Sequence, residues 1–213
     1  MTLRALDVLK TADLVLCEDT RRTQKLLSAY EIKKPLQSFH EHTSMDRVHA
    51  IIARLKAGEK IALVSDAGMP LISDPGFELV HEVIAQKLPM EVLPGPFAAI
   101  NALVASGLAV DSFSYHGFLS QKSVSRKKEL MKLEAREETL IFYESPYRVG
   151  VALEDMKEVL GDREACVARE MTKKFEEIAR GPLSELIKKF SGKKVLGEIV
   201  IVVSGKNRKK LFS

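Results

Sequence analysis

The stretch SDAGMPLISDPG, which runs from Ser65 to Gly76, decides the fold class of this chain. It follows residues 60–64, a short apolar run that predicts a buried strand, and it precedes residues 77–85, whose apolar positions recur at helical spacing. A loop that joins a parallel strand to a helix lies at the edge where open α/β sheets bind their ligands. The sequence therefore predicts an α/β fold with a ligand site at this loop.

The composition of this loop indicates what kind of ligand it suits. It contains Asp66 and Asp74 but no Lys or Arg, so it lacks the cation that a P-loop places on a triphosphate. Its two Gly and two Pro residues form tight turns that let backbone approach a ligand closely. These features favour a cationic cofactor that is held by its ribose hydroxyls. The alternative, which the loop alone leaves open, is a plain connection without a ligand.

The composition of the whole chain is that of an ordinary globular protein. Its 213 residues are 46% hydrophobic and 29% charged, which suits one large domain or two small ones. No apolar run approaches the ~20 residues of a membrane helix, so no membrane association is expected. Cys17 and Cys166 lie far apart and fit neither a zinc site nor a disulfide framework, which favours a cytoplasmic protein.

Strand-like and helix-like segments alternate along the chain, which predicts a parallel sheet in the first half. The predicted strands are 13–18, 36–40, 60–64, 90–93, 139–143, 164–169, 175–179 and 198–204. The predicted helices are 3–10, 20–30, 45–56, 77–85, 96–106, 125–133, 147–160 and 183–190. The pattern changes near residues 110–118. We therefore expect an N-terminal α/β domain at 1–111, a C-terminal α/β domain with a mixed sheet at 112–204, and a basic tail at 205–213.

Polar residues follow other predicted strands as well. Glu18 and Arg21 belong to the sequence EDTR, which ends one strand and opens a helix, so they are expected beside Asp66. Asp19 or Thr20 in this sequence also fits the N-cap of the helix, which is the alternative role. The sequence HEH at 40–42 follows the next strand. Its spacing without a third ligand is weak for a metal, so no metal is predicted.

Basic residues cluster in two places, although the net charge is only +4. Lys122, Arg126, Lys127, Lys128 and Lys132 cluster in and just before one predicted helix, and four more cations lie at 206–210. Such clusters can neutralise the phosphates of nucleic acid. The alternative is a solvated helix face and an unstructured tail. The sequence contains no GxSxG, HExxH or GxGxxG pattern, which disfavours hydrolase triads, zinc proteases and the usual dinucleotide fold.

Nine short stretches, in order along nearly the whole chain, resemble one superfamily. They are CEDTR at 17–21, HEH at 40–42, the loop at 65–76, PGP at 94–96, LVASGL at 103–108, GFL at 117–119, FYESP at 142–146, ARE at 168–170 and GEIV at 197–200. The chain resembles the tetrapyrrole-methylase-like (class III) S-adenosylmethionine-dependent methyltransferases. Within them it is similar to the enzymes that methylate the ribose 2′-hydroxyl of a cytidine in 16S ribosomal RNA.

The resemblance implies a fold, a reaction and a set of site residues. The fold is two α/β domains of the tetrapyrrole methylase type with the cofactor in the cleft between them, in a homodimer. The reaction is methyl transfer from S-adenosylmethionine to a cytidine in the decoding centre of 16S rRNA, within the small ribosomal subunit. The implied cofactor-binding residues are Asp66, Ala67, Gly68, Leu71, Ile72, Phe97 and Ala98 in the first domain, and Tyr143, Ala168, Arg169, Gly181 and Pro182 in the second.

Methyl transfer to a hydroxyl calls for a proton acceptor and for contacts to the RNA backbone. The catalytic candidates are Glu18, Asp19, Arg21, Glu41 and Glu144, and the choice of the base among the carboxylates stays open. The candidates for substrate binding are Arg21, His40, Arg126, Lys127, Lys128 and Arg148.

The chain departs from the family pattern at several positions. Met69 replaces a Thr, Phe97 replaces a Ser, and Arg22 and Tyr147 each replace a His. The first strand of the family and the turn after it, which precede the counterpart of Thr2, are absent here. We therefore expect the sequence to be a truncated version of the protein; the alternative is an impaired product.

Two rival functions follow from these residues. One is a methyltransferase of the same fold that acts on a corrinoid or porphyrin precursor. The other is a non-catalytic module that binds RNA or the ribosome.

Overall fold

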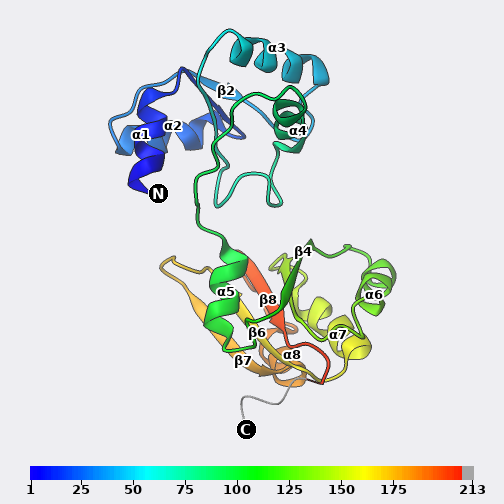
Figure 1. Ribbon diagram of the computed structural model, residues 1–213. Coiled ribbons are helices and arrows are strands. Elements are labelled where there is room, and N and C mark those ends of the chain that lie inside the picture. The colour runs from blue at the N-terminus through cyan, green and yellow to red at the C-terminus, as the bar shows by residue number, and fades with distance from the viewer. Residues whose placement is uncertain (208–213) are drawn as a thin grey trace. The chain divides into compact units, whose positions relative to one another are not determined.

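The computed structural model describes residues 1–207, and it divides the chain into two compact units (Figure 1). The first unit spans Met1–Phe97, and the second begins at Ala98. The sequence pattern placed this boundary after residue 111 instead. The difference arises because helix α5 (Ala98–Ser106) packs against the strands of the second unit. The rest of the predicted basic tail, residues 208–213, lies outside the described residues.

The first unit has three layers, with helices on both faces of a parallel sheet (Figure 1). Its strands within residues 1–207 lie in the order β2-β1-β3, with bounds Leu36–Ser38, Leu14–Cys17 and Ile61–Leu63. Helices α1 (Leu3–Thr11) and α2 (Thr20–Ala29) cover one face, and α3 (Met45–Lys56) and α4 (Phe77–Ala85) cover the other. Because both flanking strands run parallel to β1, their carboxyl ends meet at one edge. The predicted parallel sheet is thus confirmed.

The second unit is built on a mixed sheet. The described residues place five strands in the order β4-β5-β8-β6-β7, with bounds Phe113–Phe118, Thr139–Glu144, Ile199–Val203, Glu164–Arg169 and Glu177–Pro182. Helix α5 covers one face, and the other face packs on α6 (Ser123–Met131), α7 (Val149–Leu160) and α8 (Leu183–Phe190). Side chains along a strand alternate between these two faces, and this alternation sorts the candidate site residues below.

Two predicted strands differ from the structure. Residues 90–93 form no strand in the described part of the chain, because no neighbouring strand pairs with them, and Met90 and Val92 are exposed. The strand predicted at 175–179 instead runs from Glu177 to Pro182, in register with the whole of β6. None of the helices within residues 1–207 has the length and apolar content that crossing a membrane requires.

Candidate functional site

Asp66 ties the ends of two neighbouring strands together at the edge of the first sheet. Its Oδ1 accepts a hydrogen bond from the backbone N–H of Asp19 at 3.2 Å, just after β1. Its Oδ2 lies 3.3 Å from Nη1 of Arg22 in α2. The Asp66 side chain is only 18% exposed. The structure therefore brings together Asp66 and the EDTR segment. The sequence predicted this, because both follow parallel strands that end at the same edge of the sheet.

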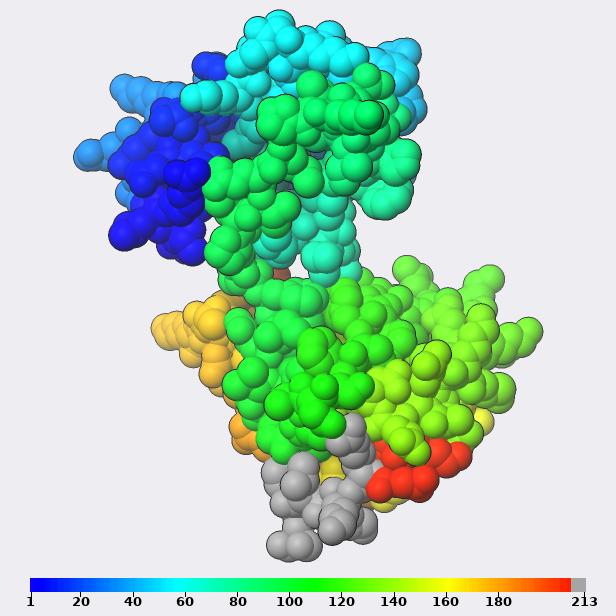
Figure 2. Space-filling view, in the orientation of Figure 1, coloured from blue at the N-terminus to red at the C-terminus, as the bar shows by residue number. Residues whose placement is uncertain are grey.

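The loop that carries Asp66 has little room for side chains. Gly68 has φ +85°, and a Cβ there would lie 3.3 Å from the carbonyl oxygen of Pro96. Leu71 and Ser73 also have positive φ, a conformation that non-glycine residues rarely adopt. Residues in such rare backbone conformations cluster at ligand sites. Figure 2 shows this segment, coloured teal, at the surface of the first unit. Bare backbone beside a carboxylate fits the ribose of a nucleoside cofactor.

The charge around Asp66 is mainly negative, and this raises the pKa of its neighbours. The pKa of Glu18 lies above its ordinary value, first because of burial and then because of the carboxylates of Asp74 and Asp66. The pKa of Asp74 is also raised, by burial and then by Asp66, although a hydrogen bond from Ser65 lowers it in part. Such a patch favours a cationic ligand over an anionic one. It also makes Glu18 a better proton acceptor than an ordinary carboxylate.

Asp19 and Arg21 are engaged with each other. Asp19 is the N-cap of α2, and its Oδ1 accepts from the backbone N–H of Arg21 at 2.9 Å and from Nε at 3.1 Å. These hydrogen bonds from Arg21 lower the pKa of Asp19 to about 2. A carboxylate of that pKa is a poor base, so the capping role weighed from the sequence describes Asp19 better. The Arg21 side chain is 87% exposed and can still meet a substrate.

His40 and Glu41 follow β2 and are exposed, and neither is hydrogen-bonded to Asp66. The backbone N–H of His40 donates to the Thr43 hydroxyl, and Glu41 pairs with His42 at 3.5 Å. The charge of Glu41 nevertheless contributes to the raised pKa of Glu18. Within residues 1–207 no group of three His, Cys, Asp or Glu side chains is placed to hold a metal.

The candidates in the second unit fall into two separate places. Tyr143 and Ala168 both pair with Val200, so they share one row of the sheet on the face that α5 covers. Gly181 and Pro182 pair with the opposite end of β6, roughly 10 Å further along the strand. Register therefore separates residues that the resemblance grouped into one cofactor site.

Arg169 and Glu144 lie one position along from this row, so they point to the opposite face, toward α7 and α8. Glu144 is buried, and its Oε1 accepts from the backbone N–H of Ser145 at 2.6 Å and from Arg148 at 2.8 and 3.0 Å. Its Oε2 is buried and has no hydrogen-bond partner in the described part of the chain. Glu144 and Arg148 thus hold the turn before α7, which is a structural role.

The basic helix α6 requires a correction. Arg126, predicted to bind substrate, is buried, and its guanidinium bonds Asp155 of α7. Lys127 pairs with Glu158 at 2.6 Å, whereas Lys128 is exposed and has no ion pair among residues 1–207. Successive helix positions differ by about 100°, so three adjacent cations cannot all face solvent in the same way. Of the three, Lys128 alone keeps an uncommitted charge.

Sequence reasoning missed two residues of the Asp66 site. Asp74 lies in the same loop and raises the pKa of Glu18, yet only its charge was noted. Arg22 pairs with Asp66, and the departure from the family pattern at this position was the available signal.

Comparisons with known proteins place this geometry in a family. Residues 1–187 match the family described as Tetrapyrrole (Corrin/Porphyrin) Methylases. The chain belongs to the tetrapyrrole methylases. Ribosomal RNA small subunit methyltransferase I of Bacillus subtilis (strain 168) is 48% identical over 211 residues, which cover 99% of this chain and 72% of that protein. Its counterpart in Thermotoga maritima is 47% identical over 206 residues, with 97% and 92% covered.

Solved structures show the same fold. The cobalamin biosynthetic enzyme cobalt precorrin-4 methyltransferase, CbiF, superposes with a TM-score of 0.68 at 16% sequence identity, over 96% of this chain and 88% of that one. The α/β fold of the tetrapyrrole methylase type that the resemblance implied is therefore confirmed, as is the resemblance itself. Together these relatives identify the chain as a methyltransferase.

Proposed function

We propose that this tetrapyrrole methylase transfers a methyl group from S-adenosylmethionine to the 2′-hydroxyl of a cytidine ribose in the decoding centre of 16S rRNA. The observation that carries the proposal is the 47% identity to the ribosomal RNA small subunit methyltransferase I of Thermotoga maritima, over 92% of that protein. The carboxylate-rich loop at the ends of β1 and β3 supports the choice of cofactor, because it suits a sulfonium cation and ribose hydroxyls.

In this proposal, different residues of the first unit bind the cofactor, accept the proton and contact the RNA. The bound cofactor supplies an activated methyl group on a sulfonium, so positioning and deprotonation are left to the protein. Asp66 holds the loop against α2 and accepts a ribose hydroxyl, and Ala67 and Gly68 bring backbone close to the cofactor. Glu18 accepts the proton of the attacking 2′-hydroxyl, because its raised pKa distinguishes it from Asp19. Arg21 contacts the RNA backbone.

The direct test is methylation of purified small ribosomal subunits that lack the modification. The protein and S-adenosylmethionine with a labelled methyl group are added, and the RNA is digested and analysed for 2′-O-methylcytidine. Label in this nucleoside is the expected result, with fully modified subunits as the control that stays unlabelled. Label in a porphyrin or corrinoid precursor, with none in the RNA, would favour the rival that shares the fold. Calorimetry without any heat of S-adenosylmethionine binding would favour a non-catalytic module.

Glu18→Gln tests the assignment of the base. We expect kcat to fall by roughly a hundredfold or more, because a positioned base contributes about that much. The wild-type rate should rise with pH through the raised pKa of Glu18, since the carboxylate must be ionised to accept a proton, and then level off. The variant should lose this rise. Glu31→Gln, at an exposed position after α2, is the matched control. An unchanged pH profile in Glu18→Gln contradicts the assignment.

The family resemblance extends the proposal to a homodimer that works in the cytoplasm, where ribosomal subunits are available. Sedimentation of the purified chain tests the first part. A monomer at the concentrations used for methylation would contradict it.

A further inference from the structure

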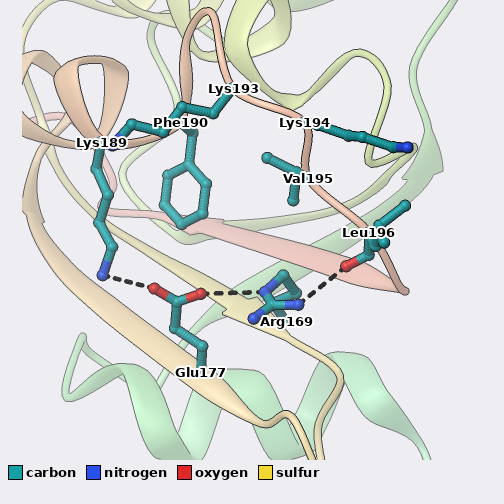
Figure 3. A pocket seen from close by; sticks show the side chains of 8 residues that line it. All are labelled: Arg169, Glu177, Lys189, Phe190, Lys193, Lys194, Val195 and Leu196. Atoms are coloured by element: carbon teal, nitrogen blue, oxygen red, sulfur yellow. Dashed lines mark hydrogen bonds and ion pairs between the residues drawn. The ribbon is translucent and has the colours of Figure 1, made fainter.

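A cavity of about 300 Å³ opens in the second unit, on the sheet face that packs against α8 (Figure 3). It lies between the end of the β6–β7 hairpin, the last turn of α8 and the segment that leads to β8. The lining residues are Arg169, Glu177, Lys189, Phe190, Lys193, Lys194, Val195 and Leu196. Apart from Arg169, none of them belongs to the site described above.

The lining carries four cations and one carboxylate, a net charge of +3. Glu177 binds two of the cations, with Oε2 3.0 Å from Nε of Arg169 and Oε1 2.7 Å from Nζ of Lys189. These contacts, that of Lys189 above all, lower the pKa of Glu177. Lys193 and Lys194 are exposed and have no carboxylate partner within residues 1–207. The cavity therefore has an unneutralised positive rim.

The fold explains Lys189 but not the two lysines that follow it. A cation in the last turn of a helix complements the helix dipole, which accounts for Lys188 and Lys189 of α8. Lys193 and Lys194 lie beyond the helix, after Gly192, whose φ of +70° turns the chain. In Figure 3 the Lys193 side chain extends above the Phe190 ring toward α8. The turn thus places Lys193 and Lys194 at the mouth of the cavity, where they add positive charge.

Apolar surface at the base of the cavity strengthens the electrostatic field of its cations. The Phe190 ring is 4% exposed, and Nζ of Lys189 lies 5.7 Å from its centroid. Charges beside buried apolar surface are screened less than charges in open solvent. Arg169 is held in place on both sides, by Glu177 and by a 3.1 Å hydrogen bond from Nη1 to the carbonyl oxygen of Leu196. A fixed guanidinium suits the oxygens of a phosphate.

We propose that this cavity binds a backbone phosphate of the RNA substrate, with Lys193, Lys194 and Arg169 as its ligands. The inference rests on the proposed function, because it takes its ligand from the RNA that the protein methylates. Arg169 points to the α8 face, away from Ala168 beside it, so its role here replaces the cofactor contact that the resemblance implied. The chemistry recognised is that of a phosphate, and RNA is its source.

The double variant Lys193→Ala/Lys194→Ala tests the site without disturbing a structural contact. RNA binding is measured by fluorescence anisotropy on a hairpin from the decoding region, between 50 and 200 mM salt, and loss of the two lysine contacts to this phosphate should raise Kd about tenfold. The slope of log Kd against log salt should fall by about 0.7–0.9, which is the contribution of one neutralised phosphate. Lys33→Ala/Lys34→Ala removes the same charge from an adjacent pair in the first unit and should change neither value. The proposed site would be overturned if both double variants changed Kd and the salt slope equally. It would also be overturned if Lys193→Ala/Lys194→Ala changed neither value.

A second measurement uses the wild-type protein, so it does not depend on a variant. Acetylation of lysines is quantified with and without the hairpin, and protection of Lys193 and Lys194, but not of Lys33, is expected. Protection by inorganic phosphate but not by the hairpin would overturn the RNA assignment. Failure of the proposed function appears separately, as RNA binding without 2′-O-methylcytidine. Methylation with unchanged Kd and salt slope in the double variant would instead reject the cavity alone.

Discussion

Asp66→Asn is expected to weaken the binding of S-adenosylmethionine strongly, and to reduce methyl transfer with it. The amide cannot form the ion pair with Arg22, and it leaves the guanidinium without its carboxylate. It also weakens the acceptor for the N–H of Asp19, which joins the loop to the end of β1. The variant also offers the ribose hydroxyl of the cofactor a neutral acceptor in place of a charged one. A hydrogen bond to a charged group contributes about 1.5–3 kcal/mol, so Kd should rise by about tenfold to a hundredfold.

Isothermal calorimetry with the cofactor measures this loss directly, and thermal unfolding checks that the variant is folded. Asp46→Asn, in the exposed first turn of α3, removes the same charge and should bind as the wild type does. Arg21→Ala should also keep cofactor binding while RNA methylation is lost, since its side chain contacts Asp19 and not Asp66. Wild-type affinity in Asp66→Asn, or loss of affinity in Arg21→Ala, would contradict the assignment.

The parts of the fold that were predicted correctly depend on local signals. The strand at Ile61–Leu63, the loop after it and the helix Phe77–Ala85 are each marked by their own residues, through apolar period and Gly or Pro. The neighbourhood of Asp66 and Asp19 followed from one further rule, that parallel strands end at the same edge.

What the sequence left undetermined depends on partners far along the chain. Helix α5 is rich in small residues such as Ala99 and Ala102, which could pack closely on either sheet, so its place in the second unit was not predictable. The separation of Gly181 from Ala168 follows from the antiparallel register of β6 and β7, which no short motif encodes. The charge pattern was the least informative signal for the candidate site, because it does not show which cation of a basic helix is buried.

Arg126 is the cation turned inward, and Arg126→Met should destabilise the second unit strongly. Its Nη2 lies 2.6 Å from Oδ2 of Asp155, and its Nη1 donates to the carbonyl oxygens of Ser120 and Gln121 at 3.1 Å. The two side chains are 2% and 9% exposed. Removing one partner of a buried ion pair costs about 3–5 kcal/mol, because the other charge stays buried. The midpoint of urea unfolding should therefore fall by more than about 1 M.

Lys128→Met is the matched control on the same helix, since this side chain is exposed, and its midpoint should stay near that of the wild type. The double variant Arg126→Met/Asp155→Leu should recover part of the loss, because it removes the unpaired carboxylate as well. Folded Arg126→Met with an unchanged midpoint and weakened RNA binding would return this residue to the substrate-binding surface. The burial of Arg126 predicts the reverse, because its guanidinium is fully engaged by Asp155 and by the two backbone carbonyls before α6.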